Sequence, residues 1–369
     1  MPIQLFKLER YFARYEFAVQ HLLSSSDSET IPMSELLAHA SDERRQQWEN
    51  LTLGYTESQG HPDLLTAISE LYDTITPQQI ISVIPEEGIF IAMNTLVQAG
   101  DHMICMFPGY QSLYEIARSR GVDVTYWQPD ENHAFDVSQL PDLLQANTRL
   151  LVVNTPHNPT GYHFSQADWQ TIIAFARDND LWLFSDEMYR LSEHDPADRL
   201  ISASDAYAKS VSLSGLSKSF GLPGLRVGWL ATQSETAMQS FVAFKDYTTI
   251  CGSAPSEILA IIALEAHQPL IKRNLDIVAH NLALLDEFFA SYSHLMRWQR
   301  PRAGTIGLVE WLGDESVDAL AENLVTSHGV MILPASVYDY AGDYFRIGFG
   351  RKTMPAALEQ LSSFLDERF

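Results

Sequence analysis

Short apolar runs that alternate with longer helical patterns constrain the fold of this sequence more than any other feature. Runs rich in apolar and β-branched residues predict strands at 102–107, 122–128, 150–154, 181–186, 210–213 and 227–231. Helical patterns are expected at 88–99, 111–119, 165–178 and 204–208. Because strands and helices alternate, we expect an α/β fold with a mostly parallel sheet sandwiched by helices.

A second unit is expected after this region. Residues 256–292 form one long helical pattern with a break near Gln268 and Pro269, and an α+β segment follows with strands at 304–311, 330–333 and 344–348 and helices at 316–327 and 355–368. A chain of 369 residues exceeds one typical domain. We therefore expect a large domain over 46–270 and a small α+β domain built from 271–369 and an N-terminal arm, 1–45. The run 24–28 is predicted to be a short loop.

Charge and composition exclude several classes of function. Lys plus Arg number 24 against 47 Asp plus Glu, and the net charge of −23 repels nucleic acids and anionic membranes. No apolar run approaches the roughly 20 residues of a membrane span, and the N-terminus does not resemble a signal peptide. Cys105 and Cys251 are expected to be core or near-core thiols of a cytoplasmic protein.

Two polar segments follow predicted strands, at the edge where open α/β sheets bind ligands. In the first, 154–161, two X-Pro steps and a glycine predict a rigid loop that presents the Asn158 amide to a ligand, with an ordinary turn as the alternative. In the second, Asp186 ends an apolar strand, where a carboxylate requires a cation or a proton donor. Tyr189 could offer its hydroxyl to the same ligand. The alternative is a helix cap at Ser185 or Asp186.

A third segment, 214–228, combines small and hydroxyl residues with Lys218 and Arg226. Backbone amides, a hydroxyl and a guanidinium suit a bound phosphate. Lys218 lies among apolar residues, where desolvation and a neighbouring cation would lower its pKa and make its amine a nucleophile.

Together, the segments around Asn158, Asp186 and Lys218 resemble those of the class I/II aminotransferases, which belong to the fold-type I enzymes that use pyridoxal 5′-phosphate (PLP). The resemblance extends from Gly54-Tyr55 to Phe345-Arg346-Ile347-Gly348. It implies that Lys218 binds the PLP aldehyde as an internal aldimine and later moves the proton at the substrate Cα.

The resemblance also implies roles for the neighbouring residues. Asp186 would pair with the pyridine nitrogen, Asn158 and Tyr189 would hydrogen-bond the ring 3′ oxygen, and Arg226 would bind the phosphate. The amides of Gly88 and Ile89 would donate to the same phosphate from a helix N-terminus.

Relatives often have Ser or Thr at the position of Gly215, which supplies no hydroxyl here. A hydroxyl that donates to the phosphate is therefore expected from Ser214 or Ser217. Tyr110 is expected to stack on the ring, with Tyr114 as the alternative.

Two further residues are assigned by the resemblance. Arg346 would bind the substrate α-carboxylate, with a surface salt bridge as the alternative, and Asn158 would contact the substrate as well as the ring. Tyr55 would reach the phosphate of a neighbouring subunit and contact its substrate, which makes a homodimer with shared active sites the expected assembly. The N-terminal cations Lys7, Arg10 and Arg14 are candidate anchors for a dicarboxylate side chain.

The expected function is transamination between an L-amino acid and a 2-oxo acid. A PLP-dependent lyase, or an enzyme catalysing β- or γ-replacement or cyclisation, is the alternative, because these reactions use the same cofactor. A non-catalytic sensor attached to a transcription regulator is disfavoured by the acidic charge. His157 and His163 are interpreted as loop and surface residues, and no metal is expected.

Overall fold

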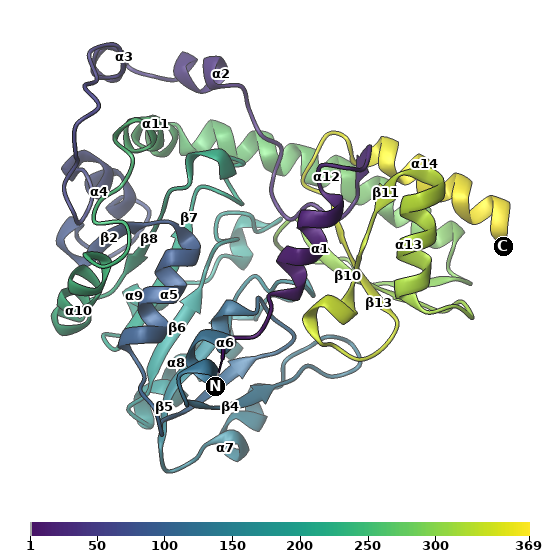
Figure 1. Cartoon of the computed structure of the whole chain (residues 1–369), viewed down its shortest axis with the longest axis horizontal. Helices are drawn as coiled ribbons and strands as arrows, with labels where there is room; N and C mark the ends of the chain where they lie inside the picture. Colours follow the sequence, from purple (N-terminus) through teal and green to yellow (C-terminus); the bar gives the residue numbers. More distant parts are fainter. Residues whose placement is uncertain (1) are drawn as a thin grey trace.

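A mostly parallel seven-stranded sheet forms the centre of the large domain (Figure 1). The computed structural model describes residues 2–369. From one edge to the other the strands are β2 (Ile80–Val83), β8 (Gly228–Ala231), β7 (Ser210–Gly215), β6 (Trp182–Asp186), β5 (Thr148–Asn154), β3 (His102–Met106) and β4 (Asp123–Trp127). The strands from β7 to β4 are parallel, whereas β8 is antiparallel to β7 and β2. All the predicted strands are confirmed, and β2 is an additional one.

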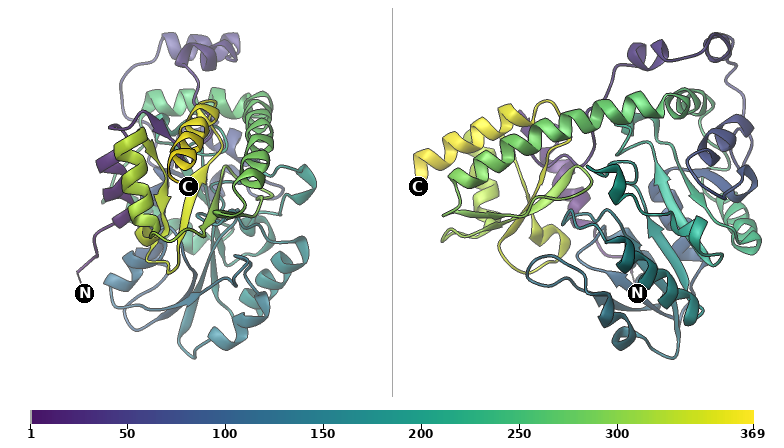
Figure 2. Two further views of the ribbon diagram at one scale, coloured as in Figure 1. Left: turned by 90° about the vertical axis from the view of Figure 1, so that its right-hand side faces the viewer. Right: turned by 180° about the vertical axis from the view of Figure 1, so that it is seen from behind.

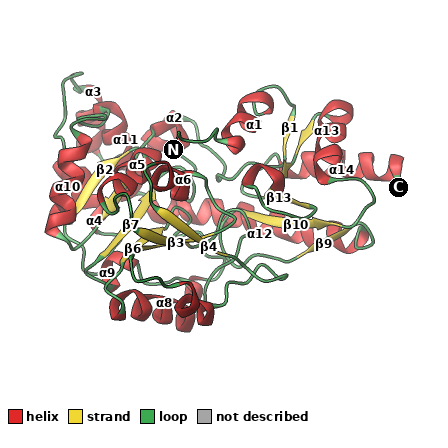
Figure 3. Cartoon of the chain, turned by 60° about the horizontal axis from the view of Figure 1, so that its bottom comes forward, coloured by secondary structure: helices red, strands yellow, loops and turns green. Residues whose placement is uncertain are grey.

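Helices cover both faces of the sheet because apolar residues fill both sides of its strands. On β3, Met103 and Cys105 pack with α5, α6 and α10, whereas Ile104 and Met106 face α7 and α8. Figure 3 shows the strands between these groups of helices. The helices are α4 (Pro62–Ser69), α5 (Pro85–Thr95), α6 (Ser112–Ser119), α7 (Leu140–Leu143), α8 (Gln166–Asp178), α9 (Ala203–Ala206), α10 (Glu235–Lys245) and α11 (Ala254–Glu265).

A 25-residue helix, α12 (His267–Ser291), connects the large domain to the small one (Figure 2). It follows α11 after a single residue, Ala266. The predicted interruption of the long helical stretch is therefore confirmed, slightly earlier than Gln268. Residues on both sides of the break, including Leu264 and Leu270, pack in the core of the large domain, so α12 begins there and reaches the small domain further along.

The small domain is an antiparallel sheet covered by helices. Its strand order is β12 (Leu333–Pro334), β13 (Tyr344–Gly348), β10 (Ile306–Trp311) and β9 (Met296–Trp298). The helices α12, α13 (Val317–His328) and α14 (Met354–Arg368) supply apolar residues to its core. Short 3₁₀ helices lie at η1 (Pro77–Gln79), η2 (Val137–Gln139), η3 (Pro196–Asp198), η4 (Pro223–Leu225) and η5 (Ala335–Tyr338).

The N-terminal arm joins the small domain through α1 (Lys7–Tyr15) and β1 (His21–Leu22). Strand β1 pairs with β11 (Val330–Met331), and α1 packs on η5. The next helices, α2 (Met33–Ala38) and α3 (Asp42–Glu49), pack against α11 instead, because Leu36 finds apolar partners in the core of the large domain. The arm therefore ends before α2, earlier than the predicted boundary at residue 45.

Within residues 2–369, no helix combines the length and apolarity that crossing a membrane requires. The two cysteines are free thiols. Cys105 is buried and Cys251 is half-buried, as expected for core and near-core positions.

Candidate active site

A cleft of about 510 Å³ lies where the carboxyl edge of the central sheet meets α1 and the small domain. Strands β5 and β6 end side by side, with Asn154 paired in register with Asp186. The large domain contributes Pro85, Glu86, Ile89, Tyr110, Asn154, Asn158, Asp186, Met188, Tyr189, Leu213, Ser217, Lys218, Pro223 and Arg226 to the lining. The arm and the small domain contribute Leu8, Glu9, Phe12, Glu16, Phe17, Ser25, Ser26, Asp27, Arg346 and Arg351. The structure thus brings most of the predicted site residues together.

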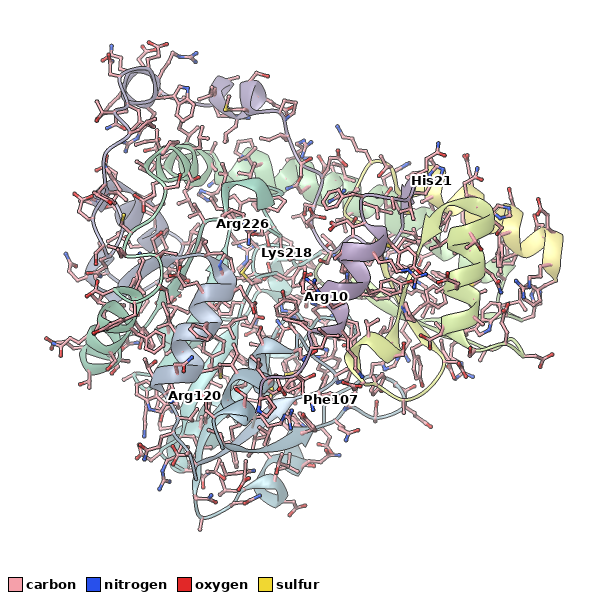
Figure 4. All side chains as sticks on the ribbon, viewed as in Figure 1. Arg10, His21, Phe107, Arg120, Lys218 and Arg226 are labelled. Carbon is pink, nitrogen blue, oxygen red and sulfur yellow. The ribbon has the colours of Figure 1, made fainter. Side chains whose placement is uncertain are left out.

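Lys218 reaches the cleft from the turn that follows β7 (Figure 4). Its Nζ atom donates a hydrogen bond to Ser26 Oγ at 2.8 Å, and it forms no ion pair with any residue in 2–369. Burial lowers the pKa of Lys218, although the charges of Asp27 and Asp186 oppose this shift. The environment therefore shifts Lys218 toward its neutral amine, which is the nucleophilic form of lysine.

Asp186 ends β6 and is only 6% exposed. One carboxylate oxygen accepts a hydrogen bond from the Met188 amide at 3.1 Å. Burial raises the pKa of Asp186 to about 7, although this hydrogen bond and the Lys218 charge oppose the rise. A turn follows rather than a helix, so the alternative of a helix cap is wrong. A cation at the free side of this carboxylate would restore its ionised form.

Arg226 lines the same cleft in a left-handed backbone conformation, with φ of 56°. Its guanidinium donates to the Pro223 carbonyl at 2.9 Å and forms no ion pair among the described residues. Figure 4 shows Arg226 and Lys218 near one another at the middle of the molecule. The free donors of Arg226 can bind an anion in the cleft.

The start of α5 differs from the expectation that placed the amides of Gly88 and Ile89 against a phosphate. The Gly88 amide donates to the Ile84 carbonyl at 2.9 Å, inside the helix, and Ile89 lies one residue further along. Because α5 begins at Pro85, which has no N–H, its unpaired first-turn amides belong to Glu86 and Glu87. Gly88 instead packs on the sheet, where a Cβ atom would lie 3.0 Å from Val83.

The side chain of Glu86 lines the cleft, although the sequence analysis assigned no role to this carboxylate. Its carboxylate accepts a hydrogen bond from Ser112 Oγ at 3.1 Å. Burial raises the pKa of Glu86 to about 7, and the charges of Glu9 and Asp186 act in the same direction. In the folded protein without cofactor, Glu86 therefore stays protonated to a higher pH than an ordinary glutamate.

Replacing Glu86 by Gln is expected to flatten the pH dependence of stability. Because the folded-state pKa lies above the ordinary value of 4.5, Glu86 contributes stability at low pH that is lost as the pH rises through 7. Thermal unfolding of the cofactor-free protein at pH 5 and pH 8 measures this. The melting temperature should fall further between the two pH values in the wild type than in Glu86→Gln. The exposed Glu359→Gln change serves as the control, and equal falls for wild type and Glu86→Gln contradict the assignment.

The structure places the two serine candidates for the phosphate differently. Ser217 lines the cleft, whereas the Ser214 hydroxyl points to the Glu187 carbonyl, 3.5 Å away. At Gly215 a Cβ atom would lie only 3.0 Å from Gly228, which explains the absence of a hydroxyl residue there.

The two tyrosine candidates for stacking on the ring also lie in different places. Tyr110 lines the cleft and its hydroxyl donates to Glu9 at 2.8 Å. Tyr114 is buried in the core against Phe107 and Tyr126.

Arg346 is buried on β13 rather than on the surface, with 1% of its area exposed. Its guanidinium donates to Asn158 Oδ1 at 3.0 Å, to the Tyr338 hydroxyl at 2.7 Å and to the Ser24 carbonyl at 2.8 Å. None of these partners is charged, and Nε has no partner at all. The alternative of a surface salt bridge is wrong, and the buried positive charge favours an anionic ligand.

The segment 24–27, which is part of the run 24–28 predicted to be only a short loop, organises several of these groups. Besides the contacts of Ser24 and Ser26 given above, the Ser26 carbonyl accepts a hydrogen bond from the Tyr189 hydroxyl at 3.0 Å. Asp27 forms an ion pair with Arg351, with contacts of 2.8 to 3.1 Å. The sequence signal was weak, because serines in a loop are common.

Tyr55, another predicted site residue, lies outside the cleft of the single chain. Tyr55 is 94% exposed and contributes nothing to the cleft lining. The interpretation of His157 and His163 as surface residues is wrong, because the loop folds inward. His157 is 1% exposed and bonds Thr160 at 2.7 Å, and His163 bonds Thr155 at 3.2 Å.

Comparison with known proteins identifies the class. Residues 22–362 match the family described as aminotransferase class I and II. Capreomycidine synthase from Streptomyces vinaceus is 31% identical over 265 residues, which cover 71% of this chain and 67% of that protein.

Solved structures agree with this match. A PLP-dependent aminotransferase from Streptococcus suis superimposes with a TM-score of 0.93 at 27% identity, covering 100% of this chain and 99% of that one. The PLP-dependent cyclase OrfR gives 0.91 at 26% identity with the same coverage. The chain therefore belongs to the class I and II aminotransferase family, whose fold it has and whose cofactor is PLP.

The ionisable groups of the cleft are complementary to those of PLP. Lys218, Asp186 and Arg226 are three ionisable groups that lack an ion-pair partner in residues 2–369. PLP offers an aldehyde to an amine, a protonatable ring nitrogen to a carboxylate and a phosphate to a guanidinium. Each of the three groups thus finds a complementary group on one small molecule.

Proposed function

We propose that this protein is a PLP-dependent aminotransferase that moves an amino group between an L-amino acid and a 2-oxo acid. The observation that carries the proposal is the Lys218 amine, held by a neutral hydroxyl in a cleft that also contains Asp186 and the buried Arg346. An amine nucleophile, a buried acid and a carboxylate-binding guanidinium are the groups that this reaction requires.

Each residue then has a definite task. When bound, PLP supplies an aldehyde that captures amino groups and a ring that withdraws electrons from the substrate Cα. Lys218 would hold the aldehyde through its amine and would move the proton at the substrate Cα. Asp186 would keep the ring nitrogen protonated. Arg226 and Ser217 would hold the phosphate, together with the free amides at the start of α5.

The remaining groups orient the ring and the substrate. Tyr110 would pack against the ring face, and Asn158 and Tyr189 would donate hydrogen bonds to its 3′ oxygen, for which the Tyr189 hydroxyl would exchange its present acceptor, the Ser26 carbonyl. Arg346 binds the α-carboxylate of the substrate, which gives its unpaired Nε an acceptor.

A half-reaction screen tests the proposal. The PLP-loaded protein is mixed with single L-amino acids, and the visible absorbance of the cofactor is followed together with the 2-oxo acid released. Transamination predicts that the visible band is lost with one 2-oxo acid formed per site, and that adding a 2-oxo acid restores it. If no amino acid changes the spectrum, the proposed function is wrong.

A cyclisation, replacement or elimination reaction is the second candidate. It is favoured by the names of two similar proteins, capreomycidine synthase and a PLP-dependent cyclase. Such a reaction regenerates the cofactor in every turnover and needs no 2-oxo acid. Sustained product formation without an added 2-oxo acid in the same screen therefore identifies it.

A homodimer is the assembly that we propose. Large apolar side chains are exposed at Leu53 (86%), Tyr55 (94%), Tyr247 (90%) and Ile250 (54%). Burial against a second copy would remove this apolar area from water. Tyr55 would then reach the phosphate and substrate of the partner's cleft.

Mixing two impaired variants tests the shared site. A hybrid of a Tyr55→Phe subunit and a Lys218→Ala subunit contains one site with both changes and one with neither. Activity is therefore expected to rise on mixing, to at most half of the wild-type value per hybrid. Differently tagged subunits confirm that hybrids form. If they form without added activity, although Tyr55→Phe alone is impaired, Tyr55 does not serve the partner's site.

A cytoplasmic location is also proposed. It is supported by the two free cysteines, since thiols persist in a reducing compartment.

A further inference from the structure

Helix α1 turns an acidic face toward the cleft. Glu9, Phe12 and Glu16 all line the cleft, at the spacing that places residues on one side of a helix. The cations of this arm, expected as anchors for a dicarboxylate, do not line it. Lys7 pairs with Asp339 and Arg14 pairs with Glu322 at 3.3 Å, and Arg10 is exposed. The arm thus presents two carboxylates on either side of an aromatic ring.

Glu16 is the carboxylate without a partner. Its side chain is half-buried and forms no hydrogen bond or ion pair with any residue in 2–369. It lies at the C-terminal end of α1, where the helix dipole disfavours a negative charge. Burial and the nearby charge of Asp27 raise the pKa of Glu16. The neighbouring cation Arg351 is already held by Asp27.

The surroundings of Arg346 indicate independently that a ligand binds in the same cleft. It is almost fully buried, and its Nε lacks an acceptor. Its guanidinium carbon lies 5.8 Å from the centre of the Phe12 ring. Glu16 follows Phe12 by one helical turn, which separates neighbouring side chains by about 5 to 6 Å. A ligand held by Arg346 can therefore extend past Phe12 toward Glu16.

We infer that the substrate is an amino acid whose side chain ends in a cation, a guanidinium or an ammonium group, and that Glu16 binds this cation. The inference rests on the proposed function, because it concerns the far end of the same substrate. Arg346 takes the α-carboxylate, the side chain packs along Phe12, and Glu16 gains the ion pair that it lacks. Glu9 adds negative charge on the other side of Phe12, although its carboxylate already accepts a hydrogen bond from Tyr110. A dicarboxylic substrate would meet both carboxylates and is disfavoured.

An isosteric pair of substrates isolates the charge. L-Arginine and L-citrulline have the same length and nearly the same shape, but only arginine is cationic. In the half-reaction with PLP-loaded protein, kcat/KM for arginine should exceed that for citrulline by about 10- to 100-fold, the range of a charge-assisted hydrogen bond. L-Glutamate should react more slowly than citrulline.

The Glu16→Gln variant assigns the effect to one residue. It should lower kcat/KM for arginine by about 10-fold or more and leave that for citrulline within about 3-fold. The matched control is Glu359→Gln, which removes one exposed charge outside the cleft and should change neither value. A binding measurement avoids catalysis altogether: 5-guanidinopentanoate has both charged ends but no amino group. Its Kd, measured by calorimetry, should rise at least about 10-fold in Glu16→Gln.

The outcomes separate this inference from the proposed function. If neutral amino acids convert and arginine does not exceed citrulline in the wild type, the cationic substrate class is wrong and transamination stands. If Glu16→Gln affects arginine and citrulline equally, Glu16 does not bind the cation. If no amino acid of any class alters the cofactor spectrum, the proposed function itself fails. If Glu16→Gln does not fold, two wild-type measurements still decide the substrate class. One is the ratio of kcat/KM for arginine to that for citrulline, and the other is the Kd of 5-guanidinopentanoate compared with that of hexanoate.

Discussion

Replacement of Lys218 by Ala is expected to abolish the visible absorbance of the PLP-loaded protein and to slow the half-reaction by at least about 10⁴-fold. The variant loses both the amine that binds the aldehyde and the base that takes the Cα proton, and a positioned base alone contributes about 10²- to 10⁴-fold. The fold should persist, because the Lys218 Nζ makes only one hydrogen bond, to Ser26 Oγ. Absorbance spectra and single-turnover kinetics measure the two losses.

Lys245 provides the comparison within the same molecule. It is the other lysine whose pKa burial lowers, but its Nζ donates to the carbonyls of Ser58 and Ser82 at 2.6 and 2.7 Å. Borohydride reduction of the PLP-loaded wild type should therefore label Lys218 and leave Lys245 unlabelled in a peptide map. A pyridoxyl group on Lys245 contradicts the assignment. The Lys209→Ala variant, which removes a lysine outside the cleft, should keep the visible band.

The central sheet could be predicted from the sequence because its signals are local. Buried parallel strands are short, nearly continuous apolar runs, and the chain changes to polar and small residues where each run ends. Asp186 is the last residue of one such strand, and Asn158 and Lys218 follow two others that end at the same edge of the sheet. Their proximity therefore followed from topology once the strands were assigned.

The contribution of the segment 24–27 could not be predicted, because its contacts join distant parts of the chain. Ser26 is separated from Lys218 by 192 positions, and Ser24 is separated from Arg346 by 322. The close approach requires a residue without a side chain at Gly348, where a Cβ atom would lie 1.7 Å from the Ser25 carbonyl oxygen. Neither the serines nor the glycine is distinctive within its own segment.

The face of α1 that lines the cleft could not be predicted from the sequence for a related reason. Its sequence contains cations and acids in similar number, and periodicity alone does not say which side faces the cleft. Packing of Leu8 and Tyr15 against Met331 and Tyr338 fixes the rotation of the helix. This rotation places Glu9 and Glu16 in the cleft and the cations outside it. On the inference drawn above, the preference for a substrate side chain depends on tertiary packing and not on the motifs of the family.

Replacement of Asp186 by Ala is expected to leave the cofactor bound but to slow Cα proton transfer by about 10³-fold. Lys218 and Arg226 remain to hold the aldehyde and the phosphate, so the visible band should persist. The ring nitrogen loses the carboxylate that keeps it protonated, and removing one such electrostatic partner costs about 10²- to 10³-fold or more. Stopped-flow absorbance with protonated and Cα-deuterated substrate measures the step directly, and the isotope effect should increase as proton transfer becomes limiting.

Two variants distinguish the charge of Asp186 from its place in the fold. Asp186→Asn keeps the shape and an acceptor for the Met188 amide, but it has no negative charge, so it should be as slow as Asp186→Ala. The neighbouring Glu187 is also buried, yet its carboxylate accepts hydrogen bonds from the Ala203 amide at 2.9 Å and Ser212 Oγ at 2.8 Å, away from the cleft. Glu187→Gln should therefore keep a near wild-type rate if it folds. An Asp186→Asn enzyme that turns over at the wild-type rate would mean that the carboxylate only shapes the end of β6, because a charge at the ring nitrogen cannot be lost without slowing the removal of the Cα proton.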